Sequence, residues 1–149
     1  MKRAWGVLFF AGLLSARAVS LTWDADPATA GVQDGAGIWN AANTNWWNGA
    51  ANTNWTSATP DAAVLGAASG AAGTVTVSGT QTVSGITLNP AGSGTYTLAG
   101  GQLTLSAPAL LHASADATIA SALGGASGLN KTGPGQVTLT GTNLFTGAV

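Results

Sequence analysis

The sequence contains no cysteine and no glutamate, and it has one histidine and four basic residues among 149. The absence of cysteine excludes disulfide bonds, a cysteine nucleophile and a thiolate metal site. Only 6% of the residues are charged, whereas about a quarter are charged in an ordinary soluble domain. Exposed helices normally carry Lys, Glu and Arg. The surface of this chain must instead consist of Thr, Ser and Asn, which suits β-strands.

Residues 1–18 have the layout of a cleavable export signal. Two basic residues precede an apolar run over residues 5–14, and Ala-Arg-Ala at 16–18 matches the small-x-small cleavage pattern. The apolar run is about half of the ~20 residues that a membrane-spanning helix needs. We therefore expect the export machinery as a partner and a mature chain that starts at Val19, with cleavage after Ser20 as the alternative.

Removal of this signal leaves one basic side chain, Lys131, against five aspartates. Binding of nucleic acid rests on neutralising several phosphates with Lys and Arg. One lysine cannot do this, so the composition excludes nucleic acid as a partner. Binding to an anionic membrane surface is excluded for the same reason, because it needs a cluster of basic residues.

The mature sequence divides into two segments of different composition. Residues 19–66 are rich in Asn and hold all five mature tryptophans, and N-T-N-W occurs there twice at a spacing of nine. Residues 67–149 contain no tryptophan and alternate apolar residues with Thr, as in TVTV at 74–77 and QLTL at 102–105. Glycine-containing turns separate these runs, which is typical of short β-strands. We expect 19–66 to cap the repeats of 67–149.

Alternation places apolar side chains on one face of each strand and Thr on the other. Short, similar, glycine-separated units favour stacking into rungs, with an apolar column inside and Thr and Asn ladders outside. The sequence therefore predicts an all-β fold, a right-handed parallel β-helix or solenoid. The alternative is a β-sandwich of immunoglobulin type. The second segment lacks the buried Trp that anchors the core of such a sandwich, which argues against this alternative.

Residues 128–147 read GLNKTGPGQVTLTGTNLFTG. The phrase combines Lys-Thr-Gly, a Thr/Leu alternation and Asn-x-Phe-Thr-Gly, and it resembles the autotransporter-associated β-strand repeat. Pro134 and Val137 are its mild departures from that pattern. The resemblance implies a passenger-type β-helix, secreted by or displayed on the outer membrane of a Gram-negative bacterium. Passengers of this family usually precede a C-terminal membrane barrel or another sorting element, so we also expect a truncated reading frame or a fragment of a longer protein. Its last rung would lack a C-terminal cap, and the exposed strand edge would favour self-association.

Side chains for catalysis or metal binding are scarce. His112 is the only histidine, and no partner at catalytic spacing stands near it except Asp116. Asp24 and Asp26 alternate as in a calcium loop, but Ala28 interrupts the ligand series. A glycosidase pair is a weaker interpretation of the same two residues. We therefore predict no catalytic residue, no metal and no cofactor.

The tryptophans offer the best candidates for ligand binding. Exposed indoles can stack on sugars, so Trp39, Trp46, Trp47 and Trp55 are candidate glycan-stacking residues, while the structural alternative is burial in the cap. The leading hypothesis is a non-enzymatic passenger segment with a display, adhesive or structural role, with a surface polysaccharide or a host or neighbouring surface as partner. The alternatives are a carbohydrate-binding module and a fragment of a β-helix polysaccharide-degrading enzyme.

Overall fold

Thirteen strands and no helix form the part of the chain that the computed structural model describes, residues 18–149. The predicted export signal therefore lies outside the described residues, except for Ala18. The strands are β1 Ser20–Trp23, β2 Gly37–Trp39, β3 Trp46–Trp47, β4 Asn52–Thr53, β5 Asp61–Leu65, β6 Thr74–Val77, β7 Thr80–Leu88, β8 Tyr96–Ala99, β9 Gln102–Ala113, β10 Ala117–Ile119, β11 Ala122–Gly124, β12 Leu129–Thr132 and β13 Val137–Leu139. Residues 18–149 thus offer no helix that could cross a membrane.

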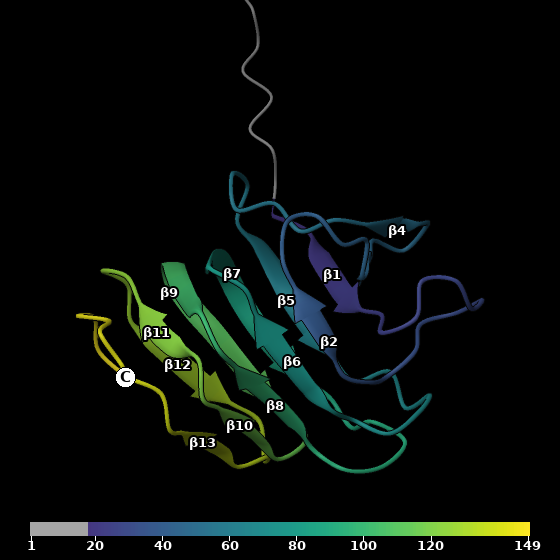
Figure 1. The fold of residues 1–149 in the computed structure, drawn as a ribbon. Helices are drawn as coiled ribbons and strands as arrows, with labels where there is room; N and C mark the ends of the chain where they lie inside the picture. Colours follow the sequence, from purple (N-terminus) through teal and green to yellow (C-terminus); the bar gives the residue numbers. More distant parts are fainter. Residues whose placement is uncertain (1–17) are drawn as a thin grey trace, which may run out of the picture.

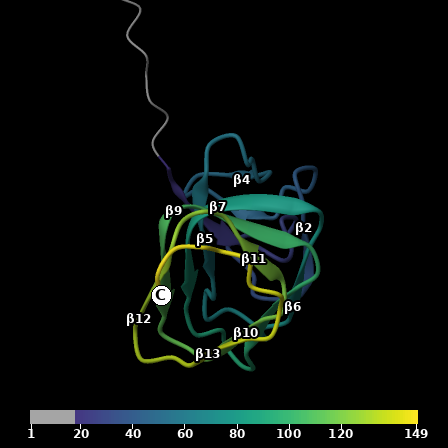
Figure 2. The ribbon, with the colours of Figure 1, turned by 90° about the vertical axis from the view of Figure 1, so that its left-hand side faces the viewer.

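The strands form two sheets that the chain visits in turn. An 8-stranded sheet has the order β11-β9-β7-β5-β1-β3-β4, with β12 also paired to β9, and a 5-stranded sheet has the order β13-β10-β8-β6-β2. Every pairing is parallel except those of β3 with β1 and β4. Figure 1 shows the coils stacked from β1 and β2 to β12 and β13, and the end-on view of Figure 2 shows the chain winding round a closed outline.

Buried side chains repeat from coil to coil and fill the interior. In the 5-stranded sheet, Val75, Leu98 and Ile119 occupy the same register position on successive strands and are buried. In the 8-stranded sheet, Ile86 and Leu111 do the same. Each column follows from the alternation in the sequence, because the period of two sends every second side chain inward. The predicted β-solenoid is therefore confirmed, and the immunoglobulin-type sandwich, which is antiparallel, is wrong.

The two segments of different composition share both sheets. β1, β2 and β5 lie within residues 19–66, yet they pair in parallel with one another or with strands of 67–149. The first coil differs from the rest because β3 and β4 add an antiparallel extension beside β1. That residues 19–66 act as a cap stays a prediction.

Residues 128–147, which resemble the passenger repeat, contribute a strand to each sheet. β12 pairs with β9, β13 pairs with β10, and Asn143 then returns to form a bridge with Leu123 of β11. The phrase therefore corresponds to one circuit of the solenoid. Gly133 of this phrase has φ +82°, and a Cβ there would collide with the backbone of Ala113 in the preceding coil. The Lys-Thr-Gly turn therefore requires glycine.

Candidate functional site

Four tryptophans pack against one another at the start of the solenoid. Trp46 is in edge contact with Trp23 and Trp39, with ring centroids 5.4 Å and 4.7 Å away, and it lies 4.7 Å from Trp55. The rings of Trp39 and Trp55 are also 4.7 Å apart. Tilted and edge-to-face contacts at these distances are the geometry that aromatic quadrupoles favour. We call Trp23, Trp39, Trp46 and Trp55 the tryptophan cluster.

The four candidate glycan-stacking residues differ in how far their side chains are exposed to solvent. Trp39, Trp46 and Trp55 are 0% exposed, whereas Trp47 is partly exposed because neighbouring residues on a strand face opposite sides. The indole N–H groups of the three buried residues have no hydrogen-bond partner within residues 18–149. Enclosed rings present no face to a sugar. Glycan stacking therefore stays a prediction, and Trp47 is the candidate of the four whose side chain solvent reaches.

Asp24 and Asp26 are used inside the fold. Asp24 is 0% exposed, and its Oδ1 accepts backbone N–H groups from Asp26 and Gln33 while its Oδ2 accepts from the Asn52 amide. Asp26 accepts from the Ala28 N–H and from the Thr29 hydroxyl, which makes a local turn. Among residues 18–149, no group of three or more His, Asp or Glu residues could hold a metal ion.

A second buried carboxylate joins three coils. Asp34 Oδ1 accepts the Tyr96 hydroxyl at 2.7 Å and the Ala67 N–H at 3.0 Å, and its Oδ2 accepts the Ser69 N–H at 2.9 Å. Burial by itself raises the pKa of Asp34, but the bonds from Tyr96, Ser69 and Ala67 outweigh it and hold the pKa below its ordinary value. Burial, and then the bond to Asp34, raises the pKa of Tyr96. This network was missed because its members are far apart in the sequence.

His112 lies on the outer side of β9 between two hydroxyl groups. Its Nδ1 is 3.0 Å from Thr132 Oγ1 and its Nε2 is 3.1 Å from Ser114 Oγ. Asp116 is engaged elsewhere, accepting the Gln136 N–H at 2.7 Å. A nucleophile–base pair needs a third group that orients the base and donors for the developing oxyanion. Here the third group is a neutral threonine, so the arrangement is that of a surface hydrogen-bond chain.

The 5-stranded sheet presents an outer face built of threonine and alanine. Thr74, Thr97, Thr118 and Thr138 occupy one register position on four successive strands. A second row beside it holds Thr76 and Ala99. Ala120 and Thr140 continue this row, because the Ala120 N–H donates to Leu98 O and the Thr140 N–H donates to Ile119 O in the same parallel register. We call these eight residues the threonine face. The alternation predicted outer ladders of Thr and Asn; the five strands of this sheet show the Thr row and contain no Asn.

The threonine face is uncharged and its hydroxyls are available. The five strands of its sheet contain no charged residue. On the 8-stranded sheet, by contrast, Thr104 bonds to Gln102 and Thr132 to His112. Parallel strands lie about 4.8 Å apart. The face therefore presents a regular lattice of hydroxyl and methyl groups to solvent.

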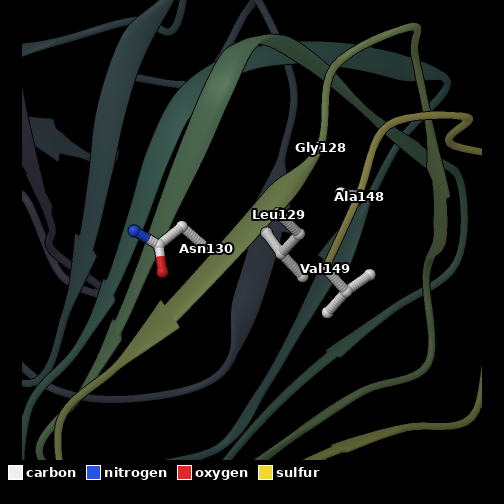
Figure 3. A pocket seen from close by; sticks show the side chains of 5 residues that line it. All are labelled: Gly128, Leu129, Asn130, Ala148 and Val149. Carbon is white, nitrogen blue, oxygen red and sulfur yellow. The ribbon is translucent and has the colours of Figure 1, made fainter.

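An apolar hollow of about 350 Å³ lies beside β12, lined by Gly128, Leu129, Asn130, Ala148 and Val149. Figure 3 shows the Leu129 side chain extending toward Val149, while the Asn130 side chain points away. Val149 is 84% exposed.

Comparison with known proteins gives one informative match. No family model matches the chain, and no solved structure matches it. The protein named Adhesin BmaC autotransporter, from Brucella suis biovar 1 (strain 1330), is 35% identical over an alignment 142 residues long, and the alignment covers 85% of this chain and 4% of that protein. The chain thus spans a small part of its relative. The β-solenoid and this similarity are both consistent with an autotransporter passenger-like segment.

Proposed function

We propose that the chain is an exported, adhesin-like segment displayed at the surface of a Gram-negative bacterium, with a binding rather than a catalytic role. The observation that carries the proposal is the threonine face, a regular uncharged surface along one side of a solenoid whose relative is named an adhesin. Residues 1–18 have the layout of an export signal, which supports transport to that location.

The composition of the threonine face favours a neutral partner. A strongly acidic polysaccharide is normally held by Lys and Arg, and the five strands of this sheet supply neither. Hydroxyl groups repeating at the rung spacing suit a partner that itself repeats and exchanges hydrogen bonds. A neutral surface polysaccharide has both properties, and it is the partner we propose.

The binding test compares lysine substitutions on the two sheets. Thr118→Lys places a charge in the middle of the threonine face, and Thr87→Lys is the matched control, since Thr87 is also an outward, half-buried threonine but lies on the 8-stranded sheet. Surfaces coated with neutral or acidic polysaccharides are incubated with each purified protein. We expect retention on neutral polymers, its loss in Thr118→Lys and its preservation in Thr87→Lys. Retention that Thr118→Lys leaves intact contradicts this surface.

A further variant separates the threonine face from the sugar-stacking alternative. Trp47→Ala removes the partly exposed indole without touching the 5-stranded sheet. Loss of polysaccharide retention in Trp47→Ala alone assigns binding to the tryptophan-rich coil. Display is tested on intact cells that express the natural gene: external protease and antibody should reach this segment without cell lysis, and protection of the segment contradicts surface exposure.

A further inference from the structure

Asp61 is a carboxylate at the head of an apolar column. It occupies an inward position on β5, and its register partners on the following coils are Val83 and then Leu105, which are both buried. Asp61 is itself only 5% exposed. Its side chain has one hydrogen bond within residues 18–149, from the backbone N–H of Val19, with 2.9 Å between nitrogen and Oδ1. Burial of a carboxylate is unfavourable unless a cation or several donors compensate it.

We infer that Asp61 binds the α-ammonium group of the mature chain, which is created when an export peptidase cleaves the bond between Ala18 and Val19. This inference rests on the export part of the proposed function. Hydrolysis adds one water molecule across the bond, so that Ala18 leaves with a carboxylate and Val19 keeps an amine, protonated at neutral pH. The nitrogen that already contacts Asp61 thereby gains a positive charge and further N–H donors.

The backbone contacts of Val19 favour cleavage after Ala18 over the alternative cleavage after Ser20. The Val19 carbonyl accepts the Ala62 N–H at 2.9 Å, and Ser20 pairs with Ala62 in the sheet. Cleavage after Ser20 would remove both contacts and leave the Asp61 carboxylate without a partner. Cleavage after Ala18 keeps every contact and strengthens one of them.

Electrostatics makes Asp61 the counterion of this amine. β1 and β3 contain no charged residue, and Asp61 is the one charged residue of β5, so no other charge faces Val19 from the strands packed there. A hydrogen bond between charged groups is roughly twice as strong as one between neutral groups. The first strand of the solenoid is therefore held most firmly after the signal has been removed.

The first test measures where the processed chain begins. The full-length chain is expressed with its signal in a Gram-negative bacterium, and the processed protein is analysed by intact mass and N-terminal sequencing. We expect Val19 as the first residue. A processed chain that is displayed but begins at Leu21 overturns the inference and leaves the proposed function standing, whereas a chain that is never exported overturns both.

The second test measures the reactivity of the amine, for which the processed chain has an internal standard. Its two amino groups are the α-amine of Val19 and the exposed Lys131 side chain. A free α-amine is normally acylated first, because it loses its proton at about pH 8 and lysine at about pH 10.4. With limiting acetic anhydride near neutral pH, we expect the folded protein to be labelled at Lys131 first and the denatured protein at Val19 first.

Asp61→Asn should restore the ordinary order of labelling in the folded protein, because the amide removes the negative charge and keeps the size of the side chain. Labelling of Val19 first in the folded wild-type protein overturns the inference. That readout needs no variant, so it decides the matter even if Asp61→Asn fails to fold.

Discussion

Trp46 is the centre of the tryptophan cluster, and its replacement by alanine tests whether the cluster stabilises the first coil. The ring is 0% exposed and packs against three other indoles at centroid distances of 4.7–5.4 Å. A buried Trp→Ala substitution costs about 3–5 kcal/mol, and each favourable aromatic pair supplies about 0.5–1.5 kcal/mol of stabilisation beyond area burial. We therefore expect Trp46→Ala to lower the free energy of unfolding by about 3–5 kcal/mol.

The neighbouring Trp47 provides the control. Because Trp47 is partly exposed, truncating it loses only part of the ~1.5–3 kcal/mol that full burial of a large apolar side chain supplies. Urea unfolding followed by far-UV circular dichroism gives the midpoint and slope for each protein. Equal losses in Trp46→Ala and Trp47→Ala would refute the reasoning. If Trp46→Ala is unfolded without urea, Trp46→Phe, which keeps a ring, gives a measurable and smaller loss.

Two further predictions concern the carboxylate network and the turns. The pKa of Asp34 is lower in the folded state than its ordinary value of 3.8. Its charged form therefore contributes folding stability that is fully present above pH 3.8 and is lost as the pH falls through the folded-state pKa. Asp34→Asn should therefore flatten the acid side of a stability–pH profile, and an unchanged acid side contradicts this role of Asp34. Tyr96→Phe should lower the free energy of unfolding by about 1.5–3 kcal/mol, because it removes a hydrogen bond to a charged group. Gly125→Ala should lower the thermal midpoint more than Gly79→Ala. A Cβ at Gly125 would lie 2.6 Å from a backbone oxygen of β9, whereas a Cβ at Gly79 would meet no atom within 4 Å. Equal shifts of the two midpoints argue against close stacking of the turns.

Strand positions and strand faces were predictable from the sequence, but the roles of the tryptophans were not. Alternation in TVTV and QLTL indicated which side chains turn inward, and Val75, Val77, Leu103 and Leu105 are indeed buried. In the first coil the strands are short and partly antiparallel, so the pattern is too brief to assign faces. Burial of Trp39 and Trp55 therefore emerges only from their packing around Trp46.

The position of Asp61 carried a signal in the sequence that is visible in retrospect. In DAAVL, over residues 61–65, the aspartate shares its phase with Ala63 and Leu65, so the period of two predicts a carboxylate that points inward. Its partner could not be predicted in the same way. Val19 is 42 residues earlier in the chain, and the pairing of β1 with β5 that brings the two together is a tertiary event.

The sequence by itself determined the class of the molecule: the shortage of charge and the alternation of Thr with apolar residues are local properties, and each strand expresses them without reference to its neighbours. Tertiary structure decided everything that depends on register. A slip of one residue would turn the threonine face inward, since side chains alternate at every position. Registers of successive coils are fixed by close approach of their turns and by contacts such as Tyr96 with Asp34, 62 residues apart. Both the uncharged lattice of Thr74, Thr97, Thr118 and Thr138 and the contact of Asp61 with the Val19 nitrogen exist only once the coils are stacked.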